Sequence, residues 1–323
     1  MVTGQVALAG VSRAVEYQPL PVKTALRPSN GEGLAWHWTL NPYRGCEMGC
    51  TFCRVRLDQR ELSSWLDFER RIGVKTQLVE AFRSDLRSEA FQKRPILLGS
   101  ETEPWQPAEE TFRVTRGLLA AMAEEEGLDV RIHTRSSLVA RDTDVLLKLA
   151  RKNRVTLTFS LASVDDRINR LMEPKAPSAL RRLAAMEALA RAGLETGLLV
   201  SPVMAGIDEK ELGLEALLTR AANAGARFAG LGFLQLGPGE RETFLSHATA
   251  RYPALSARFR RVIGRRTHSD EDQRALTEHF RGLCGRLGLE ALEQRMNGAP
   301  SERTAEPTQM ALFAGEAGEA AGA

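Results

Sequence analysis

The sequence predicts an α/β fold: a partial (β/α)6 TIM-like barrel with mainly parallel strands, followed by a helical C-terminal extension. Six short runs are apolar at nearly every position, and stretches with helical spacing separate them. Such strands are typical of parallel sheets with both faces covered, because parallel neighbours need a crossover helix. Eight units would close a full barrel, so six indicate an incomplete barrel or an open wound sheet.

The expected elements follow one another along the chain. The strands are expected at residues 36–40, 95–99, 130–134, 155–161, 196–203 and 228–236. Helices with apolar residues three and four positions apart are expected over residues 111–127, 142–152 and 180–193. Gly127, Gly193 and Gly225 follow helical stretches, and glycine is the usual residue after a last helical turn.

Composition divides the chain into four parts. Residues 1–35 mix proline, glycine and polar residues without a sustained period, so we expect an arm that packs on the domain. The barrel core is expected at residues 36–238 and the helical extension at residues 239–297. Residues 298–323 are small, acidic and rich in glycine and alanine, which predicts a disordered tail.

Overall composition limits the class of protein. The 323 residues are 43% hydrophobic and 26% charged, which excludes collagen, coiled-coil and disordered classes. No run approaches the roughly 18 apolar residues of a membrane-spanning helix, and the N-terminus lacks the features of a signal peptide. We therefore expect a cytoplasmic protein without a membrane partner. The net charge of +3 is too small by itself to indicate a polyanionic partner.

Three of the four cysteines lie within eight positions, in the segment NPYRGCEMGCTFCRVR. Cys46, Cys50 and Cys53 have the spacing C-x3-C-x2-C directly after the first expected strand, and three thiols in one loop indicate a soft metal. Gly45 and Gly49 predict a tight loop, because glycine permits the positive φ angles that such a loop requires.

The number of thiols leaves two kinds of metal site open. Zinc and iron–sulfur sites normally have four protein ligands, and the fourth is missing from the loop. Cys284 is far away in a helical stretch, where we expect a buried, inert cysteine. Three cysteines suit a [4Fe–4S] cluster with one iron free of cysteine. The alternative is a zinc site completed by His37 or His133.

In its context this motif resembles the radical S-adenosylmethionine superfamily. Further segments are similar to DNA-repair-photolyase-like proteins, the branch related to spore photoproduct lyase: GSETEPWQPAE (99–109), HTRSSLVARDTDVL (133–146), SLASVD (160–165) and LMEPKAPSALRRLAAMEALARAGL (171–194). The resemblance implies a lyase-like or other radical enzyme that cleaves S-adenosylmethionine (SAM) reductively at a [4Fe–4S] cluster. The resulting 5′-deoxyadenosyl radical would abstract hydrogen from a substrate.

The resemblance also implies which residues bind the iron–sulfur cluster and SAM. Cys46, Cys50 and Cys53 would be the metal ligands. The candidate SAM-binding residues are Ser100, Thr102, Glu103, Arg135, Ser160 and Glu173. The first three would contact the amino group, Arg135 would grip the carboxylate with two donors, and the last two would bind the ribose. A structural ion pair of Arg135 with Asp142 or Asp144 is the alternative.

For the substrate, the resemblance favours nucleic acid and DNA-repair-like chemistry. The alternatives are a radical enzyme acting on a peptide or metabolite, and a non-catalytic metal-bearing adaptor for nucleic acid or a sliding clamp. Spore photoproduct lyase returns hydrogen to its product from another cysteine in the second βα region. Here no cysteine lies between Cys53 and Cys284, so thymine-dimer reversal is not expected. Tyr43 and Tyr252 are substitute candidates, and Arg54 replaces the tyrosine that often follows the third cysteine.

Three partners are expected. Reductive cleavage needs an electron donor such as flavodoxin or ferredoxin. The arginine-rich stretch 251–268 suits phosphate contacts with nucleic acid. The peptide Gln309–Phe313 (QMALF) resembles the motif by which bacterial repair proteins dock on the sliding clamp, and its apolar residues have no core to join.

Overall fold

The protein is described by a computed structural model that covers most of the expected barrel. The described residues are 15–29, 36–53, 55–56, 67–203, 213–234, 236, 238–251, 253, 257, 260 and 270–292. Arg54, Tyr252, most of the stretch 251–268 and the whole segment 298–323, with its Gln309–Phe313 peptide, lie outside them. No helix among the described residues combines the length and the apolar character that crossing a membrane would require.

An eight-stranded sheet forms the frame, in the order β11-β10-β9-β8-β7-β6-β3-β2. Its six central strands are parallel and follow chain order: β3 (Trp38–Leu40), β6 (Ile96–Leu98), β7 (Asp129–Thr134), β8 (Arg154–Leu161), β9 (Glu195–Val203) and β10 (Phe228–Phe233). These are the six strands expected from the sequence. The outermost strands do not pair with each other in the described chain, so the barrel is partial, and the predicted fold class is confirmed.

The strands are buried almost along their whole length. In β8 the β-branched and aromatic residues Val155, Thr156 and Phe159 favour an extended chain, and all three are buried. Every position of β9 after Glu195 is buried. Such continuous burial is expected when helices cover one face of a parallel sheet and the other face lines a barrel.

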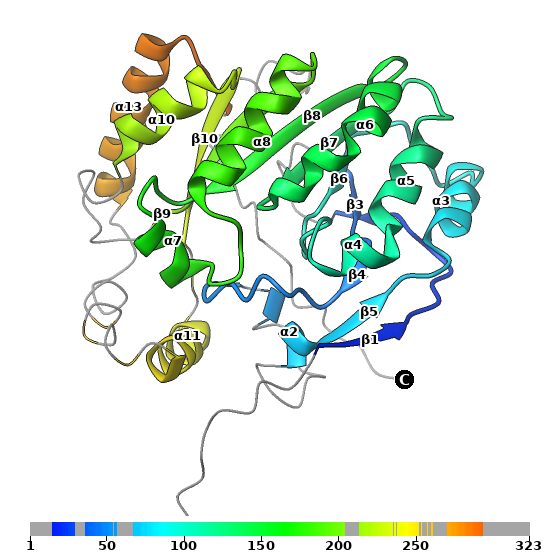
Figure 1. Cartoon of the computed structure of the whole chain (residues 1–323), viewed down its shortest axis with the longest axis horizontal. Coiled ribbons are helices and arrows are strands. Elements are labelled where there is room, and N and C mark those ends of the chain that lie inside the picture. The colour runs from blue at the N-terminus through cyan, green and yellow to red at the C-terminus, as the bar shows by residue number, and fades with distance from the viewer. Residues whose placement is uncertain are drawn as a thin grey trace, which may run out of the picture.

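Helices follow the strands and cover the outer face of the sheet (Figure 1). They are α3 (Leu78–Leu86), α5 (Val114–Met122), α6 (Thr143–Ala150), α8 (Ala179–Arg191) and α10 (Leu214–Asn223). The helix expected at 111–127 is instead two helices, α4 (Ala108–Phe112) and α5. Arg113 separates them with a left-handed φ of 51°, which a continuous helix does not permit.

The predicted glycine caps are confirmed for two of the three helices. Gly193 and Gly225 have φ angles of 95° and 83° and directly follow Ala192 and Ala224, the C-cap residues of α8 and α10. Gly127 also has a positive φ of 75°, but α5 has already ended at Met122. Its backbone N–H instead donates to the carbonyl of Lys152, which sets the entry into β7.

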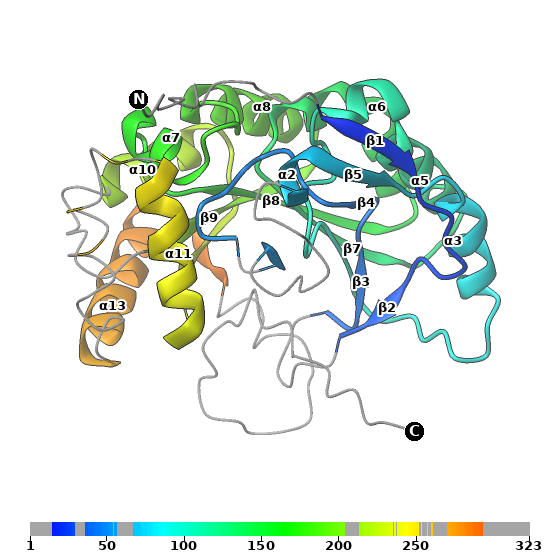
Figure 2. The same ribbon diagram turned by 90° about the horizontal axis from the view of Figure 1, so that it is seen from below.

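A small second sheet, not expected from the sequence, lies beside the barrel (Figure 2). Its strands are β1 (Glu16–Pro19), β5 (Arg71–Val74) and β4 (Tyr43–Arg44), in the order β1-β5-β4. The strand β2 (Arg27–Pro28) from the same N-terminal segment pairs antiparallel with β3. Strands of two to four residues are too short to show an alternation of apolar and polar residues, which is why the sequence did not predict this small sheet. The small sheet matters because the cysteine loop begins where β4 ends.

The described part of the C-terminal extension lies at the other edge of the main sheet. It contains α11 (Pro238–Arg251), α13 (Asp270–Leu287) and the strand β11 (Glu290–Ala291). The helix α13 packs on α10 and β10, and β11 adds to β10 in parallel. The domain boundaries named above remain expectations.

Candidate functional site

The cysteine loop is held by backbone hydrogen bonds to two other segments. The N–H of Cys46 donates to the carbonyl of Phe68 at 2.8 Å, in the short helix α2 (Asp67–Arg70). The N–H of Thr51 donates at 2.9 Å to the carbonyl of Met172, the last residue of α7 (Asp166–Met172). The loop is therefore fixed between α2 and the segment that follows β8.

Side chains of the loop tie it to the segment after β6. The N–H of Glu47 donates to Gln106 Oε1 at 2.9 Å, and Gln106 Nε2 donates to the Gly45 carbonyl at 3.2 Å. Glu47 Oε1 accepts in turn from the N–H of Ala108 at 2.8 Å. Glu47 and Gln106 are both buried, so these bonds are shielded from water.

The two glycines of the loop adopt the predicted positive φ angles, 79° for Gly45 and 68° for Gly49. A Cβ on Gly45 would lie 2.7 Å from the Arg71 carbonyl oxygen, and one on Gly49 would lie 3.0 Å from Glu69 Oε2. Any other residue would therefore suffer backbone strain at both positions and, at Gly45, also a clash with the backbone. The tight loop expected from the sequence is confirmed.

The loop places its three cysteines in one apolar cluster. Cys46 packs with Met48 and Phe68, and the half-buried Cys50 and Cys53 lie against this cluster. Burial raises the pKa of the Cys46 thiol to about 12. Burial also raises the pKa of Cys50 well above its usual value, although nearby Arg135 opposes the shift. Thiols that stay protonated when free must lose their protons when they ligate a metal.

Ser100 and Thr102 are both held by Asn41, at the end of β3. Asn41 Nδ2 donates to Ser100 Oγ at 2.9 Å, and Asn41 Oδ1 accepts the N–H groups of Glu101 and Thr102 at 2.9 and 3.2 Å. Thr102 Oγ1 donates to the Tyr43 carbonyl. Asn41 was not among the residues expected from the sequence. Asn41 could have been predicted as a site residue, because it directly follows a strand and belongs to the cysteine motif.

The other four candidates form a second network, which extends along the carboxyl ends of β6, β7 and β8. Glu103 is buried and accepts from Thr134 Oγ1 at 2.6 Å and from the N–H of Arg135 at 2.7 Å. Arg135 Nε donates to Glu173 Oε1 at 2.8 Å. The Arg135 guanidinium also lies 5.6 Å from the centre of the Phe52 ring, directly before the third cysteine.

Arg182, on α8, completes this network and was missed in the sequence. Its Nη1 pairs with Glu173 Oε2 at 2.5 Å and donates to the Ser160 carbonyl at 2.9 Å. Ser160 Oγ itself donates to the Ser201 carbonyl at 3.4 Å. The apolar spacing of α8 contained the signal, because Arg182 lies on the buried face with Leu183, Met186 and other core residues.

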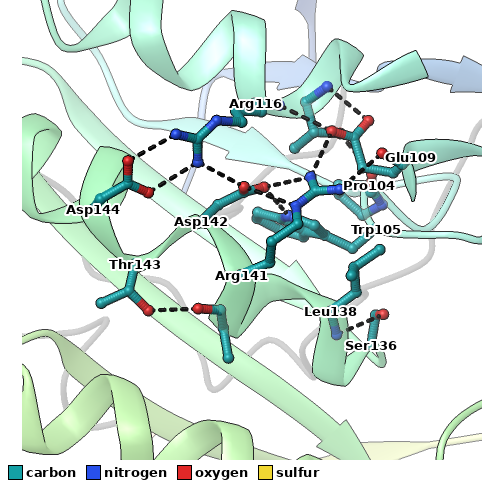
Figure 3. A network of polar contacts seen from close by, with 12 residues as sticks. Pro104, Trp105, Glu109, Arg116, Ser136, Leu138, Arg141, Asp142, Thr143 and Asp144 are labelled. Atoms are coloured by element: carbon teal, nitrogen blue, oxygen red, sulfur yellow. Dashed lines mark hydrogen bonds and ion pairs between the residues drawn. The ribbon is translucent and has the colours of Figure 1, made fainter. Parts of the chain in front are cut away.

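Arg135 does not pair with Asp142 or Asp144, the structural alternative considered above. Both aspartates accept instead from Arg116, whose Nη1 lies 2.9 Å from Asp142 Oδ1 and whose Nη2 lies 2.7 Å from Asp144 Oδ2 (Figure 3). Asp142 also accepts from Arg141 and from the Trp105 indole. These contacts form a separate network.

Tyr43, a candidate hydrogen donor, and the fourth cysteine, Cys284, are both engaged in contacts away from the cysteine loop. The hydroxyl of Tyr43 donates to Glu109 within a buried contact, and burial next to Glu109 raises the pKa of this tyrosine. Cys284 is 1% exposed and packs in the main core on α13, at the β10 edge of the sheet. The buried, inert cysteine expected from the sequence agrees with this position.

The arrangement of the possible ligands does not by itself separate a zinc site from a cluster, because the following result also holds for Cys46, Cys50 and Cys53. Within the described residues, no three histidine, cysteine, aspartate or glutamate side chains are arranged to hold a single metal ion. His133 is buried at the end of β7, where burial and the nearby Arg135 lower its pKa to about 3. A cubane cluster differs from a zinc ion in that each thiol meets its own iron atom.

A thiol loop beside the carboxyl ends of a partial parallel barrel defines a cofactor-dependent class of α/β-barrel enzyme. Residues 40–217 match the Radical SAM superfamily, so the chain belongs to this superfamily and is a radical SAM enzyme. An uncharacterized protein of Mycobacterium tuberculosis is 28% identical over 303 residues, which cover 93% of this chain and 88% of the relative. An uncharacterized protein of Methanocaldococcus jannaschii is 23% identical over 200 residues, with 61% and 71% covered.

Solved structures confirm the fold. A spore photoproduct lyase mutant with bound AdoMet and dinucleoside spore photoproduct superimposes with a TM-score of 0.62 and 14% sequence identity. The match covers 85% of this chain and 81% of that chain. The resemblance to spore photoproduct lyase that the sequence suggested therefore extends to the architecture.

The superfamily implies a [4Fe–4S] cluster and SAM, and the residues present fit both groups. Three thiols line one buried loop with two positive-φ glycines. Arg135 Nη2 is buried and has no hydrogen-bond partner among the described residues. Native proteins rarely leave such a donor unpaired, so a ligand that accepts hydrogen bonds is expected next to it.

Proposed function

We propose that Cys46, Cys50 and Cys53 hold a [4Fe–4S] cluster and that the chain cleaves SAM reductively for hydrogen abstraction from a substrate. The observation that carries this proposal is the proximity of the thiol loop to Arg135, whose charge acts on the Cys50 thiol and whose guanidinium stacks on Phe52. The thiols that would bind the cluster and the arginine that would bind the carboxylate of SAM therefore lie close enough to act on the same SAM molecule.

The cluster, when bound, supplies the electron that breaks the sulfonium bond of SAM and releases a 5′-deoxyadenosyl radical. The protein residues would bind and orient SAM and exclude water. We propose that Arg135 binds the carboxylate through its unpaired Nη2. Ser100 and Thr102, fixed by Asn41, would line the amino-group side, and Ser160 would lie near the ribose.

Two of the proposed roles differ from those implied by the resemblance. The carboxylate of Glu103 already accepts three hydrogen bonds within the protein, from Thr134 Oγ1 and from the N–H groups of Arg135 and Trp105. Both oxygens of Glu173 are engaged by arginines. We therefore propose that Glu103 and Glu173 do not contact SAM directly. Instead, they shape the SAM site by holding Arg135.

Anaerobic reconstitution tests the proposal. We expect about four iron atoms per chain and 5′-deoxyadenosine formation that depends on SAM and on a reductant such as flavodoxin or dithionite. Cys50→Ala is expected to abolish 5′-deoxyadenosine, because a cluster held by two thiols loses a corner ligand. Cys284→Ala is the matched control, since this thiol packs in the core, and it should retain cleavage. One zinc per chain and no cleavage would refute the proposal.

For the substrate we propose nucleic acid. The support is the sequence resemblance to DNA-repair-photolyase-like proteins together with the matching fold of spore photoproduct lyase. The missing cysteine donor argues against the lyase's own reaction, so another radical reaction on a nucleotide is proposed. Deuterated oligonucleotides test this: deuterium in 5′-deoxyadenosine supports it, whereas transfer only from a peptide or metabolite would favour the alternative substrates.

A further inference from the structure

The Nη2 of Arg135 has no hydrogen-bond partner among the described residues, although the carboxylate of Glu173 is bonded to the Nε of the same side chain. Arginine and carboxylate groups usually pair through two parallel hydrogen bonds, and one common form uses Nε together with Nη2. Glu173 makes only the bond to Nε, at 2.8 Å. Glu173 is fully buried, so water does not compete for its second oxygen.

Arg182 accounts for this one-sided pairing. Its Nη1 forms an ion pair with Glu173 Oε2 at 2.5 Å, although the two groups are not aligned for a hydrogen bond. Without this ion pair, the oxygen would be available to Arg135 Nη2. Arg182 is itself firmly placed: its side chain is 1% exposed, and its Nε and Nη1 donate to the carbonyls of Pro177 and Ser160. Glu173 is thus shared between two guanidinium groups, and each of them keeps a buried Nη2 that is unpaired within the described chain.

This part of the site holds as many guanidinium groups as carboxylates, and three of its buried atoms have no hydrogen-bond partner among the described residues: Arg135 Nη2, Arg182 Nη2 and Glu173 Oε2. Two guanidinium groups, Arg135 and Arg182, face two carboxylates, Glu103 and Glu173. Burial raises the pKa of Glu103, and the hydrogen bonds from Thr134, Arg135 and Trp105 only partly oppose this shift. A ligand group that accepts hydrogen bonds, such as a carboxylate, would satisfy the unpaired donors.

We infer that Arg182 is a positioning residue for the SAM carboxylate. By capturing Oε2 of Glu173, Arg182 prevents Glu173 from closing on both Nε and Nη2 of Arg135. Arg135 is then fixed through Nε and keeps Nη2 free for the ligand. This inference rests on the proposed SAM site. It assigns to Arg182 the role of keeping Arg135 Nη2 available for the carboxylate of SAM.

The test measures how strongly the site prefers SAM to decarboxylated SAM. Binding of both is measured by calorimetry on the anaerobically reconstituted protein without reductant, so that no cleavage occurs. For Arg182→Met we expect Glu173 to close on Arg135 and SAM affinity to fall about tenfold to a hundredfold. The affinity for decarboxylated SAM should stay within about threefold, so the preference for the carboxylate is lost. Equal losses for both ligands, or no loss, would overturn the inference.

Further variants separate positioning from a purely structural role. Arg182→Lys keeps a charge for Oε2 and should retain the preference. Adding Glu173→Gln to Arg182→Met should recover part of it, because the neutral amide competes less for Nη2. Arg141→Met is the matched control: it removes an arginine that pairs with Glu109 and Asp142, and it should leave the preference unchanged.

Circular dichroism checks that the Arg182 variants fold. If Arg182→Met does not fold, Arg182→Gln provides the same loss of charge with a side chain that can still bond to backbone oxygens. An unchanged preference in that variant would overturn the inference. If the unmodified protein binds neither ligand and makes no 5′-deoxyadenosine, the proposed function fails, whereas a normal preference that Arg182 does not affect refutes only the inference.

Discussion

Two of the buried arginine–carboxylate networks in the described part of the chain differ in one respect. The Asp142 network, made of Trp105, Glu109, Arg116, Arg141 and Asp142, leaves none of its buried side-chain nitrogen or oxygen atoms unpaired within the described chain (Figure 3). The Glu173 network, made of Glu103, Arg135, Glu173 and Arg182, leaves two guanidinium nitrogens and the Glu173 Oε2 atom without a hydrogen-bond partner among the same residues. A network that is fully paired stabilises the fold, whereas one with unpaired donors indicates where a ligand binds.

Position in the fold agrees with this difference. The Glu173 network joins the ends of neighbouring strands β6, β7 and β8, which is the edge where parallel barrels place their ligands. The Asp142 network joins α4, α5 and the 3-10 helix Ser137–Asp142 that precedes α6. The first network therefore lies at the edge where a parallel barrel binds its ligands, and the second lies away from it.

The largest effect on stability is expected for Asp142→Ala. Both carboxylate oxygens are fully buried, and their loss leaves Arg141, Arg116 and the Trp105 indole without an acceptor. Because the two arginines are partly exposed, we expect the lower end of the usual range, a loss of about 3 kcal/mol in the free energy of unfolding. Urea unfolding measures it. The preference for SAM over decarboxylated SAM should not change, and a changed preference would mean that the two networks are coupled.

A smaller effect is expected on the pH dependence of stability. Burial raises the pKa of Asp142, but hydrogen bonds from Arg141, Trp105 and Arg116 outweigh burial and hold the pKa below its usual value. A lowered folded-state pKa stabilises the protein above the unfolded pKa of about 3.9, and this stability is lost as the pH falls through the folded pKa. Asp142→Asn should therefore flatten the decline in stability below about pH 4, and an unaltered decline would contradict this assignment.

The smallest effect is expected for Tyr43→Phe. The change removes one hydrogen bond to Glu109, which still accepts from the N–H groups of Thr115 and Arg116. We expect a loss of about 1 kcal/mol in the free energy of unfolding and unchanged 5′-deoxyadenosine formation. Abolished product turnover in this variant, with cleavage intact, would instead make Tyr43 a hydrogen donor and would connect the Asp142 network to the reaction.

Local sequence patterns predicted the frame of the fold and the loop that carries the thiols. Continuous apolar runs predicted β3, β6, β7, β8, β9 and β10, because a strand that is covered on both faces is apolar at nearly every position. The spacing of Cys46, Cys50 and Cys53, with two glycines, likewise predicted a tight loop. The small sheet was missed, since its strands are too short to show a period.

By itself, then, the sequence determined the order of the strands, the thiol loop and the superfamily. Only the tertiary structure decided which carboxylate Arg135 meets. In the chain, Asp142 and Asp144 are closer to Arg135 than Glu173 is, yet Glu173 is its partner and Arg182 holds that partner in place. The physical reason is that buried charges pair with whatever the neighbouring strand ends bring within hydrogen-bond distance. That proximity depends on how whole elements pack rather than on separation along the chain.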